Sequence, residues 1–118
     1  MKTIIASLLL VISATAAFAA ESFAGTFLYK YKGGSTYRVT IPDAEKLHWE
    51  CIEGDEKGAK GDEKPTRYTV ADGIYFASWV EKTGIVVTQV VNMKTSKVYS
   101  TIVEGKDRFV LEGDVTKE

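Results

Sequence analysis

The chain has few of the residue types that most often carry catalysis or hold metals. Among its 118 residues there is one cysteine, Cys51, and one histidine, His48. A lone cysteine forms no internal disulfide, and we expect Cys51 to be buried as a small hydrophobic side chain. These two residues form neither a zinc-binding cluster nor a Ser-His-Asp or Cys-His arrangement. We therefore expect no metal and no cofactor, and a surface position for His48.

The chain also lacks an excess of charge of either sign. Its 15 Lys and Arg residues stand against 16 Asp and Glu residues, a formal net charge of −1. No basic face is formed by these residues, so the sequence gives no indication of a nucleic-acid partner.

Residues 1–19 are typical of a secretory signal peptide. Lys2 gives a short basic start, a largely apolar run extends from Ile4 to Ala17, and Ala17-Phe18-Ala19 fits the small-residue cleavage rule. The apolar run is too short to serve comfortably as a membrane anchor. We expect cleavage after Ala19, and a single mature domain over residues 20–118 that is periplasmic or secreted and carries no membrane anchor.

The remaining chain consists of short runs typical of β-strands, separated by turn residues. Val, Ile, Tyr, Phe, Trp and Thr are frequent in these runs, as in pleated and half-buried strands. Gly33-Gly34 and Asp72-Gly73 fit tight hairpin turns. Residues 53–65 are charged and rich in glycine, so we expect a solvated loop or lid there. The expected strands are residues 23–32, 35–41, 46–52, 66–71, 74–81, 85–93, 97–104 and 108–116.

Eight strands joined mostly by hairpins favour closure into one barrel, because closure removes the exposed strand edges. An eight-stranded barrel is just wide enough to be filled by side chains or to hold one small ligand. The sequence therefore predicts an all-β fold: a single eight-stranded antiparallel up-and-down β-barrel of lipocalin type.

Strand alternation places several aromatic side chains on faces that can point inward. Aromatic rings with polar tips suit a ligand cup, although such rings also fill barrels that bind nothing. Glu81 is either a surface carboxylate at a hairpin end or, inside an apolar cup, an acid or base with a raised pKa. A register change of one residue would turn Glu81 outward. The candidate ligand-binding residues are Tyr29, Tyr31, Tyr37, Trp49, Trp79 and Glu81.

The segment Gly73-Ile74-Tyr75-Phe76-Ala77-Ser78-Trp79-Val80-Glu81, followed by Thr83-Gly84 and a valine-rich run, resembles a segment shared by two related groups of calycin-type barrels. These groups are the MoaF-like proteins, which are small lipocalin-like domains, and the bacterial phenolic acid decarboxylases. Tyr29-Lys30-Tyr31, with the Gly turn and Tyr37 that follow, resembles the tyrosine pair of the decarboxylases' first strand. The resemblance covers residues 68–104 and, less closely, 25–38.

The resemblance implies roles for three residues. In the decarboxylases two tyrosines hold the substrate, and a glutamate after the Ser-Trp pair protonates or orients it; the matching positions are Tyr29, Tyr31 and Glu81. Those enzymes also use an arginine before the Ser-Trp-x-Glu strand. The equivalent stretch here, residues 53–65, has lysines and no arginine, and Arg38 and Arg67 fall elsewhere.

Three functions follow as hypotheses. The first is an exported lipocalin-like barrel that binds a small apolar or aromatic ligand in its interior and is not an enzyme. The second is a lyase or isomerase, carboxy-lyase-like, with Glu81 as acid or base and with Tyr29 and Tyr31 orienting the substrate. The third is a protein-interaction module with a filled barrel. The sequence is compatible with an oligomer and does not name the ligand.

Overall fold

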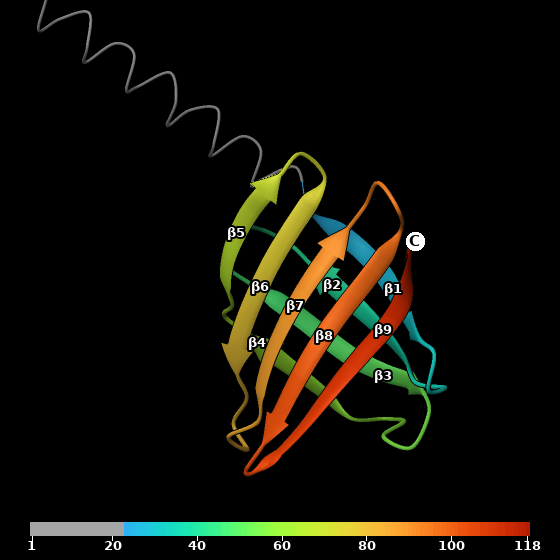
Figure 1. The fold of residues 1–118 in the computed structure, drawn as a ribbon, viewed down its shortest axis with the longest axis vertical. Helices are drawn as coiled ribbons and strands as arrows, with labels where there is room; N and C mark the ends of the chain where they lie inside the picture. The colour runs from blue at the N-terminus through green and yellow to red at the C-terminus, as the bar shows by residue number, and fades with distance from the viewer. Residues whose placement is uncertain (1–22) are drawn as a thin grey trace, which may run out of the picture.

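The computed structural model describes residues 23–118, which form one antiparallel β-sheet (Figure 1). The predicted signal peptide, residues 1–19, lies outside the described residues. The predicted all-β antiparallel fold is confirmed, and no helix in the described part of the chain is long and apolar enough to cross a membrane. The strands are β1 (Gly25–Tyr31), β2 (Thr36–Ile41), β3 (Leu47–Glu53), β4 (Lys60–Glu63), β5 (Thr66–Ala71), β6 (Ile74–Val80), β7 (Val86–Asn92), β8 (Lys97–Glu104) and β9 (Asp107–Lys117).

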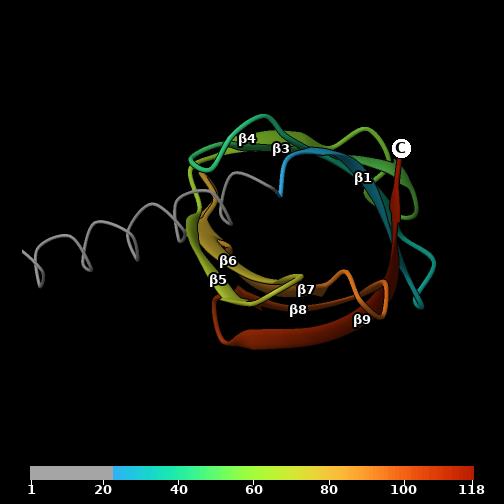
Figure 2. The same cartoon turned by 90° about the horizontal axis from the view of Figure 1, so that it is seen from above.

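The sheet is an up-and-down meander with one long-range pairing. Its strand order is β4-β3-β2-β1-β9-β8-β7-β6-β5, so all neighbours in the sheet except β1 and β9 are consecutive in sequence. Seen from above, the sheet curls strongly, and β1, β3 and β4 face β5–β8 across the interior (Figure 2). Two walls therefore enclose the core, one made of β1–β4 and the other of β5–β8.

The expected count of eight strands is wrong, because β4 forms inside the predicted loop 53–65. This strand pairs with β3 from Leu47↔Glu63 to Glu50↔Lys60. Its sequence, Lys-Gly-Asp-Glu, has no apolar alternation, so the backbone ladder and polar contacts to β3 hold it. Among these contacts, His48 Nδ1 lies 2.8 Å from Asp62 Oδ1. Four residues of the predicted loop, Lys60–Glu63, thus form an edge strand.

Barrel closure, the other part of the expected fold, is incomplete. Strands β4 and β5 are the two ends of the sheet, and no backbone pairing joins them within residues 23–118. The chain passes from β4 to β5 through Lys64 and Pro65, and proline has no N–H group to add to a ladder. The fold is therefore a strongly curled, nine-stranded half-barrel.

The predicted alternation of inward and outward side chains along the strands agrees with the buried residues of the structure. On β1, the side chains of Phe27, Tyr29 and Tyr31 are buried, whereas Lys30 between them is exposed. Cys51 is also buried, as predicted. Residues paired directly across two strands lie on the same face of a sheet.

The register aligns the aromatic side chains of one wall. Tyr29 is paired with Tyr37, and Tyr37 with Cys51, while Val39 is paired with Trp49 on the next rung. These pairings bring the aromatic side chains of β1, β2 and β3 together on the inner face of that wall.

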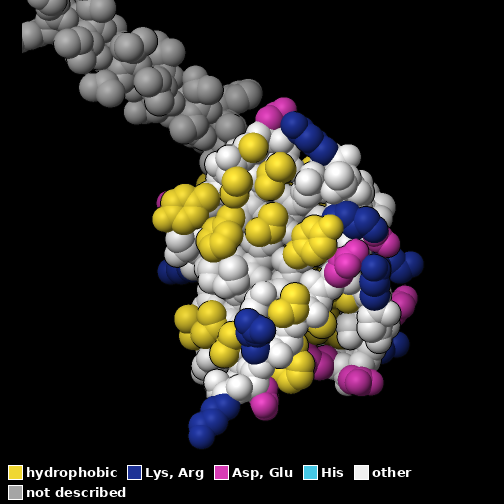
Figure 3. All heavy atoms as spheres, in the orientation of Figure 1, with side chains coloured by type: hydrophobic (Ala, Val, Ile, Leu, Met, Phe, Trp, Pro, Cys, Tyr) yellow, Lys and Arg dark blue, Asp and Glu magenta, His cyan; other side chains and the backbone are white. Residues whose placement is uncertain are grey.

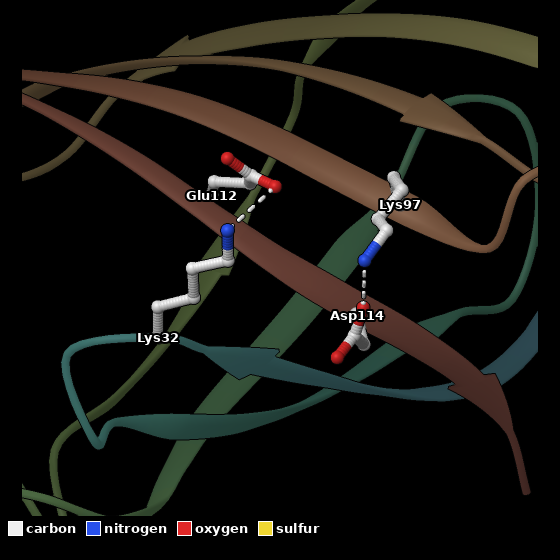
Figure 4. Close-up of polar contacts among 4 residues, drawn as sticks. All are labelled: Lys32, Lys97, Glu112 and Asp114. Carbon is white, nitrogen blue, oxygen red and sulfur yellow. Dashed lines mark hydrogen bonds and ion pairs between the residues drawn. The ribbon is translucent and has the colours of Figure 1, made fainter.

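The outer face of the sheet carries both polar contacts and exposed apolar side chains. Ion pairs join β9 to its two neighbours: Lys97 Nζ lies 2.6 Å from Asp114 Oδ1, and Lys32 Nζ, just beyond β1, lies 3.0 Å from Glu112 Oε2 (Figure 4). Both pairs are solvent-exposed and contribute little to stability. Hydrophobic side chains gather on the same outer face (Figure 3). Large exposed side chains on this face include Tyr68, Val80, Tyr99 and Val110.

Candidate functional site

A cavity of about 80 Å³ lies between the two walls of the sheet. One water molecule needs roughly 10–15 Å³ of cavity volume, so this cavity holds several waters or a small ligand. The structure brings all the predicted ligand-binding residues to this cavity. Tyr29, Tyr31, Tyr37 and Trp49 come from β1–β3, Trp79 from β6, and Glu81 from the turn that follows β6.

Glu81 lies just past the end of its strand and still faces inward. The predicted strand 74–81 ends one residue earlier, since β6 stops at Val80. The backbone N–H of Glu81 donates to the carbonyl of Ile85 at 2.8 Å and closes the turn. This bond continues the β6 alternation by one residue, so Glu81 shares the inner face with Trp79.

Tyr31 forms the polar part of the cavity wall together with two residues that the sequence interpretation did not single out. Its hydroxyl lies 2.6 Å from Ser100 Oγ and accepts a bond of 3.4 Å from Gln89 Nε2. Burial raises the pKa of Tyr31 to about 12, although both hydrogen bonds act in the opposite direction. Gln89 and Ser100 are polar residues at inward positions of β7 and β8. A polar residue at an inward strand position is the sequence signal that could have identified both as site residues.

Tyr29 is almost completely buried, with 1% of its surface exposed, and it lines the cavity. Burial raises the pKa of Tyr29, the neighbouring Tyr31 raises it further, and the charge of Arg67 lowers it. Tyr29 is therefore a neutral group at neutral pH.

Three glutamates each accept a hydrogen bond from an aromatic residue of the cavity wall. Glu81 Oε2 accepts from Trp79 Nε1 at 3.2 Å, and Glu63 Oε2 accepts from Trp49 Nε1 at 2.9 Å. Glu56 Oε2 accepts from the Tyr37 hydroxyl at 3.3 Å. These bonds fix the orientation of three aromatic rings around the cavity.

Glu63 and Glu56 also affect Glu81 electrostatically. Burial raises the pKa of Glu81 above its ordinary value, and the negative charges of Glu63 and Glu56 raise it further, while the Trp79 bond lowers it. Burial likewise raises the pKa of Tyr37, with the Glu56 charge as the next cause. The cavity lining around Glu56 and Glu81 is therefore acidic.

Glu56 and Glu63 were not predicted as site residues, because both lie in the stretch expected to be a mobile loop. Strand β4 carries Glu63 to Trp49, and Gly61 on the same strand makes room for the indole ring. A Cβ atom at Gly61 would stand only 2.8 Å from Trp49 Nε1. The pattern Gly-x-Glu on a polar edge strand thus serves to hold Trp49.

Arg67 lines a second, smaller space together with Tyr29 and does not line the main cavity. Its Nη1 donates to the backbone carbonyl of Asp43 at 2.9 Å, and its Nη2 is buried without a partner in the described part of the chain. This second space has a volume of about 10 Å³, enough for about one water. Burial lowers the pKa of Arg67. No lysine or arginine among residues 23–118 lines the main cavity.

A curled antiparallel sheet that encloses an interior space is similar in architecture to lipocalin-type barrels. The family model described as MoaF-like matches residues 24–116, and the chain belongs to the MoaF-like family. The resemblance stated from the sequence is thereby confirmed. No curated protein matches this chain.

The fold is also similar to that of a solved Burkholderia vietnamiensis protein described as "a putative beta-lactamase". The two share 22% sequence identity with a TM-score of 0.76, over 81% of this chain and 95% of the other. At this level of identity the likeness shows a shared fold alone, and no activity follows from it.

Proposed function

We propose that this protein binds a small aromatic or apolar ligand in the cavity between the two walls. The convergence of Tyr29, Tyr31, Tyr37, Trp49, Trp79 and Glu81 around one free volume is the observation that carries the proposal. A concave site with mostly apolar walls and a few placed polar groups is typical of small-molecule binding. The tyrosines of the cavity wall supply polar groups that can orient a ligand.

The proposed location is periplasmic or secreted, with the small ligand as partner and no nucleic acid. The signal-peptide pattern of residues 1–19 supports export. An exported binding domain without a disulfide depends on its core and its ligand for stability.

Tryptophan fluorescence tests the proposal directly, because Trp49 and Trp79 are the only tryptophans and both line the cavity. The mature protein is titrated with phenols, phenolic acids and small hydrophobic molecules. We expect saturable quenching or a spectral shift with at least one class.

A pair of variants on β8 provides the control. Ile102 lines the cavity, whereas its neighbour Thr101 lies on the opposite face of the strand. Ile102→Phe should fill the space and abolish the response, while Thr101→Phe should leave it unchanged. If no compound in the panel changes the emission, or if Ile102→Phe has no effect on binding, the interaction-module hypothesis takes first place.

A second candidate is a lyase or isomerase, and the raised pKa of Glu81 supports it. Glu81 shares the cavity with Tyr29 and Tyr31, the three positions that match the decarboxylase residues. The absence of a basic side chain among the described residues that line the cavity weighs against a carboxylate substrate. Product analysis of the titrated phenolic acids tests this candidate. Turnover that survives in Glu81→Gln would rule out Glu81 as the acid or base.

A further inference from the structure

The charges around the cavity have one sign. Glu56 and Glu81 line it, and Glu63 lies close enough to both Trp49 and Glu81 to affect each. The salt bridges found among residues 23–118 involve none of these three glutamates. The described lining of the cavity therefore includes two carboxylates and no lysine or arginine.

The aromatic rings of one wall are tilted toward one another. The centroids of Tyr31 and Tyr37 lie 5.9 Å apart at 77°, and those of Tyr37 and Trp49 lie 6.0 Å apart at 66°. The glutamate bonds described above hold Tyr37, Trp49 and Trp79 in place from outside the rings. Aromatic faces set at steep angles around a small space form an aromatic cage, which attracts cations through the ring quadrupoles.

We propose that the ligand of this cavity is a small organic cation, with an ammonium group between Glu56 and Glu81 and a carbon body against the aromatic wall. This inference rests on the proposed function and adds the charge class of the ligand. A carboxylate that is partly removed from water is stabilised strongly by an opposite charge. An anionic ligand would be repelled by the same groups, and a neutral one would leave both carboxylates without a counter-charge.

Three soluble probes of matched size and different charge separate these cases: benzylammonium, benzyl alcohol and benzoate. Their affinities are measured at neutral pH by tryptophan fluorescence and by calorimetry. We expect benzylammonium to bind about tenfold or more tighter than benzyl alcohol, as a charge-assisted contact would give, and benzoate to bind weakest.

Isosteric variants locate the effect. Glu56→Gln and Glu81→Gln should each lower the preference for benzylammonium over benzyl alcohol about tenfold. Glu104→Gln, at the exposed end of β8, is the matched control and should change neither affinity. Far-ultraviolet circular dichroism and urea unfolding verify that each variant is folded.

The two proposals fail in different ways. If benzyl alcohol or benzoate binds as tightly as benzylammonium, or if both glutamine variants keep the preference for the cation, the ligand is not a cation and the proposed binding function stands. If only neutral compounds from the panel of phenols, phenolic acids and small hydrophobic molecules bind, the ligand is again not a cation and the proposed binding function stands. If no probe and no panel compound binds, both proposals are wrong, and the glutamates serve only to hold the aromatic rings.

Discussion

Arg67 Nη1 donates a hydrogen bond of 2.9 Å to the backbone carbonyl of Asp43 and thereby joins the two walls of the half-barrel. Arg67 lies on β5, an end strand of the sheet, whereas Asp43 lies in the turn between β2 and β3. No backbone ladder joins β5 to β4 within the described residues. This side-chain hydrogen bond therefore connects the two walls on the side where no backbone pairing closes the sheet.

We predict that Arg67→Ala destabilises the protein by about 1–3 kcal/mol, the range for a hydrogen bond to a charged group. Urea unfolding followed by tryptophan emission measures the change. Arg108→Ala, at an exposed position of β9, is the control and should stay within about 0.5 kcal/mol of the parent. Equal stability of the two variants would show that Arg67 does not support the open side of the barrel.

A second prediction concerns the buried contact of 2.6 Å between the Tyr31 hydroxyl and Ser100 Oγ. Tyr31→Phe leaves Ser100 and Gln89 without their partner, at a cost of about 1–3 kcal/mol. A double-mutant cycle with Ser100→Ala should show a coupling energy of about 0.5–3 kcal/mol. Tyr99→Phe, at an exposed position on the outer face, should be neutral. Additive single effects would contradict the contact.

Gly113 gives a third prediction, because β1 and β9 approach closely at this residue. A Cβ atom there would stand 2.5 Å from the carbonyl oxygen of Lys30 and 3.0 Å from the Cα of Tyr31. We expect Gly113→Ala to destabilise the fold by at least about 1–3 kcal/mol, as overpacking against backbone does. Gly33→Ala is the matched control, because no atom lies within 4 Å of its added Cβ. A thermal melt of both variants should show a lower midpoint for Gly113→Ala alone.

The raised pKa of Glu81 predicts how stability changes with pH. Below its ordinary pKa of 4.5, Glu81 is protonated in both the folded and the unfolded protein. As the pH rises from there to the folded pKa, the unfolded chain loses the proton first, so the free energy of unfolding falls; above the folded pKa the penalty is complete.

Glu81→Gln removes this penalty and keeps an oxygen that can accept the Trp79 bond. The variant should match the parent at low pH and exceed it in stability at neutral pH, as measured by urea unfolding at a series of pH values. Glu104→Gln, exposed at the end of β8, is again the control. A stability difference between Glu81→Gln and the parent that does not change with pH would contradict the prediction.

The inward aromatic residues could be predicted because strand alternation has a period of two and the glycine turns fix its phase. Tyr29 and Trp79 both lie inside their predicted strands, so an error of one residue at a strand end does not change the face on which they lie. Glu81 follows Trp79 by two residues and takes its face from the same alternation. The structure places all three at the cavity.

The ninth strand and the contacts that hold the cavity could not be predicted in the same way. Lys60–Glu63 has no apolar side of its own, and its pairing depends on the backbone of β3 and on the distant Trp49. The inward position of Arg67 depends on Asp43, which is 24 residues away in sequence. Such contacts arise from the tertiary fold and leave no local pattern in the sequence.

The pairing of β1 with β9 has a consequence for how the chain folds. Every other pairing forms between consecutive strands, whereas this one must join residues such as Phe27 and Lys117, from opposite ends of the sheet-forming chain. The backbone N–H of Glu118 donates to the carbonyl of Thr26 at 2.8 Å, so the start of β1 and the end of β9 lie side by side. A circular permutant opened between Lys64 and Pro65, with β9 linked to β1 by a short turn, would have its strands in the same order in sequence as in the sheet. Such a permutant would replace the one non-local pairing by a hairpin, lower the contact order and fold faster into the same half-barrel.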